Sequence, residues 1–238
     1  MRLRWFKPLR GWRRLCGEVG IIVLGVLIAL GAQQLVQEMT DRAAARHARS
    51  AIRSELQVNM ARLASRSAVR GCVERRLEEV QALLDRAAQT GETSNPRWIG
   101  RPQYWTMQTS RWDALAQAGR AALLRDDELV EFSQLYHWMR NISSEMSAEQ
   151  TDWAQLRTLE HLSKASPDTL FELNSVLQDA RYRHWRIGQH TALLVPIARQ
   201  AQLQRVRNDI PAPRSICISM DTPRAQAIRE SGSPYGEP

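Results

Sequence analysis

The chain has 238 residues, of which 43% are hydrophobic and 24% are charged, so it can bury a substantial core and is not disordered throughout. Its formal net charge is +8, but six basic residues lie within positions 1–14, and beyond them basic residues outnumber acidic ones by only two. The positive charge is therefore concentrated at the N-terminal tip. This distribution argues against nucleic-acid binding by the rest of the chain and favours targeting to a membrane.

An apolar segment follows this tip. Residues 19–32 are fourteen uncharged residues, fewer than the about 20 that cross a bilayer. The apolar residues on both sides extend the segment to residues 15–36, which as a helix measure about 33 Å. Glu18 lies one turn after Arg14, so the two charges can pair near the headgroups. The sequence therefore predicts a transmembrane helix over residues 15–36.

The charges on the two sides of this segment predict its orientation. Residues 1–14 are strongly basic, whereas residues 33–48 carry two arginines and two acidic residues. The positive-inside rule then places residues 1–14 in the cytoplasm and the chain from residue 37 onward in the periplasm of a bacterial cell. Four residues are expected at the cytoplasmic membrane interface: Trp5, Trp12, Arg14 and Glu18.

A cleaved signal peptide is the alternative interpretation of the same segment. A basic stretch, a short apolar stretch and small residues at Ala29 and Gly31 fit that pattern. However, no glycine or proline lies between Ala32 and Arg70, so the helix is expected to continue past the point of cleavage. We therefore expect an uncleaved anchor, and a secreted helical protein remains the alternative.

The body of the chain shows helical periodicity. Apolar residues recur every three or four positions from residue 52 to residue 84, and a shift of phase at residues 65–68 indicates a kink or a change of buried face within one long rod. After a loop over residues 90–102, a short helix and two long ones are expected, with Ser166 and Pro167 starting the last. Pro196 is expected to kink that helix without ending it.

These elements predict an all-α protein in which the transmembrane helix continues into an antiparallel helical bundle. Alternating strand patterns of useful length are absent from the sequence, and the bundle is expected over residues 37–207. The tail over residues 208–238 holds five of the ten prolines and lacks periodicity, so it is expected to be extended or disordered.

Four stretches carry a resemblance to a known family: GEVGIIVLGVLIALGAQQ, RGCVERRLEEVQALL, SRWDALAQAGRAALL and ARYRHWR. Together they resemble a family of small proteobacterial proteins with one N-terminal membrane span and no assigned activity. The resemblance extends over most of the chain. It implies an inner-membrane anchor and an exported helical domain, and it implies nothing about catalysis.

Motifs for chemistry are lacking. The five histidines are widely separated, and the sequence has no metal-ligand spacing, nucleotide-binding loop or nucleophile elbow. We therefore expect no catalytic, cofactor-binding or metal-binding residues, and a non-enzymatic interaction or scaffold module. The alternative is a periplasmic enzyme that combines a histidine with a carboxylate, chosen from His137, His161, His184, Glu149 and Glu160.

Besides the lipid bilayer, the expected partner of such a module is a second protein or a further copy of the chain, and aromatic residues suggest where it binds. Trp98, Trp105 and Trp112 recur every seven residues. They either fill the distal end of the bundle or form an exposed interaction patch. The basic and aromatic stretch Arg181–Arg186 has acidic residues to pair with and is expected to be a solvated helix face, so nucleic acid is not an expected partner.

Cysteine placement leaves two alternatives. Cys16 lies at the cytoplasmic edge of the predicted span, which leaves Cys72 and Cys217 on the oxidising side. An up-and-down bundle would bring the last helix to the distal end, and the ten residues from Asn208 to Cys217 reach roughly 33 Å when extended. The two cysteines can then pair. Otherwise Cys72 is a small buried hydrophobic residue and Cys217 a free thiol on the tail.

Overall fold

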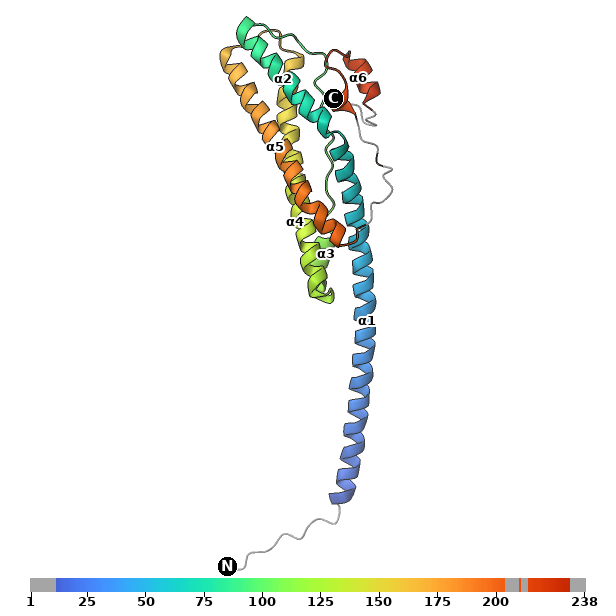
Figure 1. Cartoon of the computed structure of the whole chain (residues 1–238). Coiled ribbons are helices and arrows are strands. Elements are labelled where there is room, and N and C mark those ends of the chain that lie inside the picture. The colour runs from blue at the N-terminus through green and yellow to red at the C-terminus, as the bar shows by residue number, and fades with distance from the viewer. Residues whose placement is uncertain (1–11, 204–209, 211–213, 232–238) are drawn as a thin grey trace, which may run out of the picture. The chain divides into compact units, whose positions relative to one another are not determined.

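The computed structural model describes residues 12–203, 210 and 214–231, with side chains from residue 16 onward (Figure 1). Contacts between Cα atoms divide the chain into two units, Met1–Arg49 and Ser50–Pro238. The boundary falls within the first helix, α1 (Trp12–Ala68).

The first unit contains the apolar part of α1. Near the N-terminus of the described residues, this helix is long and apolar enough to cross a membrane, and its most apolar 18-residue window is entirely unburied. Glu18 is exposed on this helix. Trp5 and the side chains of Trp12 and Arg14, which were expected at the interface, lie outside the described part of the structure.

The second unit is built of helices. Its described residues form no strand beyond an isolated bridge between Glu92 and Lys164, so the expected all-α class is confirmed. After α1 the α-helices are α2 (Arg70–Thr90), α3 (Ser110–Gln117), α4 (Asp126–Leu156), α5 (Pro167–Gln200) and α6 (Arg224–Glu230). Three 3-10 turns accompany them: η1 (Arg120–Leu123), η2 (Arg157–Glu160) and η3 (Ser215–Cys217). Pro196 lies inside α5, which continues past it as expected.

The boundary between α1 and α2 corrects the expectation of one unbroken rod. Val69 leaves the helical conformation, with φ −100° and ψ 9°. Its carbonyl oxygen accepts hydrogen bonds from the backbone N–H groups of Cys72 and Val73, at 3.0 and 3.1 Å, which starts the new helix at once. Val69 is itself buried. The break therefore redirects the chain while the apolar faces of both helices stay against the core, which agrees with the phase shift at residues 65–68.

Helix directions follow from which residues meet. Glu55 of α1 contacts Tyr136 of α4, and further along α1 Arg66 contacts Glu149, which also lies further along α4. These two helices therefore run parallel. The long helix α5 packs beside α4 and α2, and its residues pair with theirs in reverse order. Since α1, α2 and α4 all run the same way, the chain needs a long return between α2 and α4 (Figure 1).

Residues 92–109 make this return as an extended segment, which we call the strap. A single extended segment has no neighbouring strand along its length to satisfy its backbone, so helix side chains supply much of the hydrogen bonding. The side chain of Asn59 accepts from the N–H of Gln108 at 2.8 Å and donates to the same residue's carbonyl at 2.7 Å. The Glu160 carboxylate accepts from the N–H of Ile99 at 2.8 Å, and the Gln150 amide donates to the carbonyl of Pro102 at 2.9 Å.

Buried apolar residues form two main cores. One gathers residues of α1, α3, α4 and α5, including Leu56, Phe132, Ile142 and Leu194. The other gathers residues of α2, the end of α4, η2 and the opposite part of α5, including Val80, Trp153, Leu159 and Leu177. In α1, α4 and α5 the two cores are separated by charged residues, which include Arg66, Glu149 and Arg183.

The C-terminal tail differs from its prediction. Residues 214–231 are ordered against the rest of the unit and were wrongly expected to be extended or disordered. Ile216 and Ala227 are buried, and Arg224 pairs with Glu160 at 2.9 Å. The carbonyl of Met220 accepts from the backbone N–H groups of Arg97 and Trp98. Contacts with the strap therefore order this part of the tail, although its own sequence has no helical periodicity.

Gly100 shows how closely the tail and strap approach, and it yields a prediction. A Cβ atom there would lie 2.7 Å from the Ser215 carbonyl oxygen and 2.9 Å from Nε1 of Trp98, at a φ of +69°. Gly100→Ala should therefore lower the free energy of unfolding by about 2–4 kcal/mol, through strain and overpacking. Urea unfolding of the full chain in detergent, followed by circular dichroism, measures this loss.

Gly91 is the matched control for this substitution. Its φ is +71°, but a Cβ atom there would meet nothing within 4 Å. Gly91→Ala should therefore show only the cost of the left-handed backbone, about 1 kcal/mol. Equal losses for the two variants would contradict the close approach of the tail to the strap.

Candidate interaction surface

Cys72 and Cys217 are joined in the structure. Their sulfur atoms are 2.06 Å apart, and the bond closes a loop of sequence separation 145. Cys72 lies in the first turn of α2, and Cys217 ends η3. Of the two alternatives that the sequence left open, this is the paired one. The bond fastens the ordered tail to α2.

The three tryptophans do not form a joint exposed patch. Trp98 is fully buried, and its Nε1 donates to the Ser215 carbonyl at 2.9 Å. Trp112 is buried against Tyr136, with ring centroids 5.3 Å apart, and Trp105 packs partly buried on the same core. The interaction-patch alternative is therefore wrong for this trio. The seven-residue spacing has no helical meaning here, because Trp98 and Trp105 lie in the extended strap.

A layer of charged side chains separates the two apolar cores. Nη2 of Arg66 lies 2.8 Å from Oε1 of Glu149, and both side chains are almost wholly buried, at 2% and 1% exposure. On α5, Arg183 pairs with Asp152 at 2.7 Å, and Arg186 pairs with Glu145 at 2.9 Å. The three pairs balance in charge; for the buried Arg66–Glu149 pair this balance is required, whereas Arg183 and Arg186 are 31% and 36% exposed. They also fix the register of α1, α4 and α5.

Electrostatics within this layer differ between its carboxylates. Burial by itself raises the pKa of Glu149, but the charge of Arg66, the nearby His184 and the hydrogen bond from Arg66 outweigh it, so the pKa lies below its ordinary value. At Asp152 burial dominates over Arg183, and the pKa is raised. Of these two carboxylates, Glu149 is therefore the one held more firmly in its charged form.

Histidine placement bears on the enzyme alternative. His184 is brought to Glu149, with Nδ1 3.8 Å from Oε1, and the same nitrogen lies 3.3 Å from Nη2 of Arg66. His137 instead meets the amide of Asn141, and His161 is exposed beyond η2. Of the three proposed histidines, only His184 thus lies beside one of the proposed carboxylates, Glu149. There it packs against the buried Arg66–Glu149 pair.

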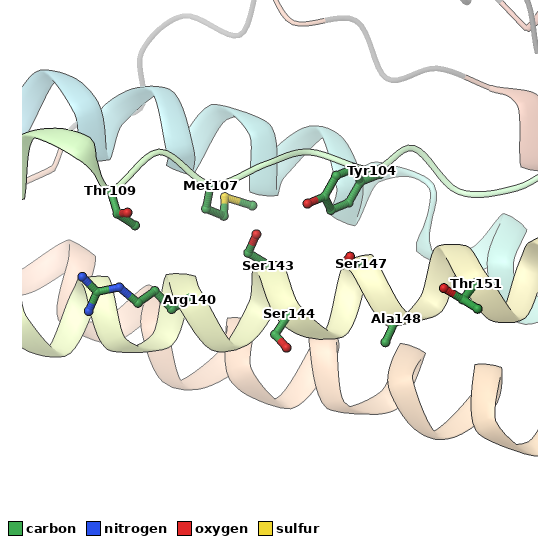
Figure 2. Close-up of a pocket in the computed structure, with 9 residues that line it drawn as sticks. All are labelled: Tyr104, Met107, Thr109, Arg140, Ser143, Ser144, Ser147, Ala148 and Thr151. Atoms are coloured by element: carbon green, nitrogen blue, oxygen red, sulfur yellow. The ribbon is translucent and has the colours of Figure 1, made fainter. Parts of the chain in front are cut away.

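A groove of about 640 Å³ opens between the strap and α4 (Figure 2). Hydroxyl groups dominate its lining, with Arg140 at one end. The guanidinium of Arg140 pairs with Asp113. Hydroxyls without a neighbouring base are weak nucleophiles, and the nine lining residues include no histidine or carboxylate. Its lining consists of Tyr104, Met107, Thr109, Arg140, Ser143, Ser144, Ser147, Ala148 and Thr151.

The outward side of α5 carries the surface best suited to binding. Positions separated by three, four or seven residues share one side of a helix, which we call the outer stripe of α5. Its members are Phe171, Ser175, Tyr182, Trp185, Gln189 and Leu193. Large apolar side chains are half or more exposed at four of them: Phe171 (76%), Tyr182 (53%), Trp185 (56%) and Leu193 (50%).

Two of these rings form a continuous aromatic surface. The centroids of Tyr182 and Trp185 are 5.8 Å apart, with the planes inclined by 25°. Arg186 lies over the Tyr182 ring at 5.7 Å and is held by Glu145. Exposed aromatic side chains grouped on one face are typical of protein interaction sites.

This surface was not predicted from the sequence. The expected solvated face at Arg181–Arg186 is indeed exposed, but it carries the apolar rings of Tyr182 and Trp185. The signal was available: Phe171, Tyr182, Trp185 and Leu193 keep helical spacing. They are out of phase with the buried residues Leu173, Leu177 and Leu194, and a second apolar side on one helix indicates a second contact.

Comparison with protein-family models, with curated proteins and with solved structures gave no match for this chain.

Removing one member of the buried pair should be strongly destabilising. Glu149→Gln leaves the guanidinium of Arg66 without its counter-charge, and we expect a loss of about 3–5 kcal/mol in the free energy of unfolding. The double variant Arg66→Met, Glu149→Leu should recover most of that loss. Asp127→Asn, in an exposed pair with Arg125, should change stability by less than about 1 kcal/mol. Similar losses of stability for Glu149→Gln and Asp127→Asn would contradict the burial of the Arg66–Glu149 pair.

Titration of Glu149 should make the free energy of unfolding depend on pH. Because the pKa of Glu149 is lower in the folded than in the unfolded chain, its stabilising contribution is full above the unfolded value and is lost as the pH falls through the folded one. Urea unfolding below about pH 4.5 should therefore show a smaller decline for the double variant than for the wild type. An equal decline would mean that Glu149 does not titrate in this way.

Breaking the disulfide should loosen the tail. For a loop of this length the chain-entropy relation gives roughly 5 kcal/mol, so Cys217→Ser should lower the free energy of unfolding by about 2–5 kcal/mol and expose residues 214–231 to proteases. Cys16→Ser is the matched control, because Cys16 is free and exposed. An unchanged stability and digestion pattern for Cys217→Ser would show that the tail is held without the bond.

Proposed function

We propose that the chain is a single-pass inner-membrane protein with a cytoplasmic N-terminus, whose periplasmic helical unit is a non-catalytic interaction module. The observation that carries the proposal is the Cys72–Cys217 disulfide. Structural disulfides persist in oxidising compartments and are rare in the cytosol. The bond therefore supports a periplasmic location for the helical unit.

Two further features support the same topology. The apolar part of α1 precedes the disulfide-bonded unit and has the length to cross a membrane. Six basic residues stand before it, which favours retention of the N-terminus in the cytoplasm. Membership of the proteobacterial family that the sequence resembles is part of this proposal, since that family has the same organisation.

A binding role is favoured over catalysis by the placement of the polar groups. His184 and Glu149 lie together, but they are buried in a charge-balanced layer whose partners are all protein groups. The groove at the strap offers hydroxyls without a lining base. The exposed aromatic residues of α5, by contrast, are placed where another protein can reach them.

The topology can be tested by fusing a reporter enzyme that is active only after export behind Pro238, in a Gram-negative host. The reporter should be active, and the full-length chain should remain in the membrane fraction after alkaline carbonate extraction, because an apolar helix is not released by loss of charge. A control fusion that lacks residues 15–36 should be inactive.

Two results would contradict the proposal. An inactive reporter on an intact, membrane-bound chain would place the helical unit in the cytoplasm. A soluble, active product beginning near Ala32 would establish the secreted alternative.

A further inference from the structure

The outer stripe of α5 is unusual in charge as well as in exposure. About a quarter of the chain is charged, yet none of the six stripe residues is. By helix geometry the charged neighbours Glu172, Asp179 and Arg181 lie on the flanks of the stripe. Arg186, at its edge, is occupied by Glu145 and Tyr182. Depletion of charge together with aromatic enrichment is the compositional mark of an interface centre.

A neutral stripe suits one kind of partner particularly well. In a two-fold symmetric interface the same patch faces itself, so any charge near the axis meets a like charge. Aromatic and aliphatic side chains have no such conflict. The neutral polar members also pair with their own kind, because the amide of Gln189 and the hydroxyl of Ser175 each contain a donor and an acceptor.

The size of the stripe bears on how strong such an interface is. From Phe171 to Leu193 the helix rises about 33 Å, and a helix face is roughly 10 Å wide. The resulting area of roughly 300 Å² is well below the about 800 Å² per partner of a stable soluble complex. Copies that share a membrane need less, since anchoring confines them and raises their effective concentration.

We propose that the outer stripe of α5 binds the outer stripe of a second copy of this chain, forming a two-fold symmetric homodimer of the helical unit. The inference rests on the proposed function in one respect, because membrane anchoring supplies the confinement. Tyr182 and Trp185 form its centre, and Phe171 and Leu193 its ends.

Site-specific photocrosslinking of the full chain in its host membrane tests this inference. A photoreactive amino acid at Gln189 should give an adduct of twice the 27.2 kDa chain mass. The same amino acid at Gln155, an exposed glutamine of α4, is the matched control and should give little or no adduct. In the same membrane, Trp185→Glu and Phe171→Glu should each lower the yield of the Gln189 adduct by about tenfold or more. Both side chains are exposed, so circular dichroism should show that each variant keeps its helical content.

The outcomes separate the candidate occupants. A Gln189 adduct of doubled mass that disappears in the Trp185→Glu variant supports the symmetric dimer. An adduct of any other mass, no adduct, or a dimer that Trp185→Glu leaves intact overturns it. Failure of the membrane proposal is seen separately, as release of the chain by carbonate, and leaves the identity of the adduct readable.

Discussion

The Arg66–Glu149 ion pair lies where two apolar cores meet, and the arrangement of α1, α4 and α5 depends on it. Two nearly unexposed charges are tolerable in a protein interior only when each has its partner, so the helices that carry them have one permitted register. Arg183 and Arg186 extend this constraint to α5. The turn at Val69 follows one helical turn after Arg66, where α1 gives way to α2 and the second core begins.

Parallel packing of α1 and α4 is the second organising feature, because it forces the strap. An extended chain inside a helical unit can persist only if its backbone groups are bonded, and here side chains of buried or half-buried helix residues such as Asn59, Gln150 and Glu160 bond them. The tail then bonds to the strap and is fastened to α2 by the disulfide. Strap, tail and disulfide thus form one continuous structure.

Periodicity in the sequence predicted the helices, the apolar membrane-length segment and the passage of α5 through Pro196, because each is a local property. It indicated a kink or a change of buried face at residues 65–68 but not that α1 ends there, and it did not predict the ordered tail, which is set by contacts with residues far along the chain. The tryptophan trio illustrates the limit: the seven-residue spacing of Trp98 and Trp105 does not place them on one helix face, because Asn59 and Glu160 hold the strap extended. Similarly, spacing could suggest that Cys72 and Cys217 pair but could not place them together.

The helical unit and Cys16 are proposed to lie in different compartments, with the helical unit on the oxidising side of the membrane. The redox state of the three cysteines tests this in the unaltered chain. Thiols are alkylated at once in protein taken from its bacterial envelope, and the peptides are mapped without reduction. The account predicts a linked pair of peptides containing Cys72 and Cys217, together with an alkylated Cys16. Alkylated, unlinked Cys72 and Cys217 in freshly trapped protein would contradict it.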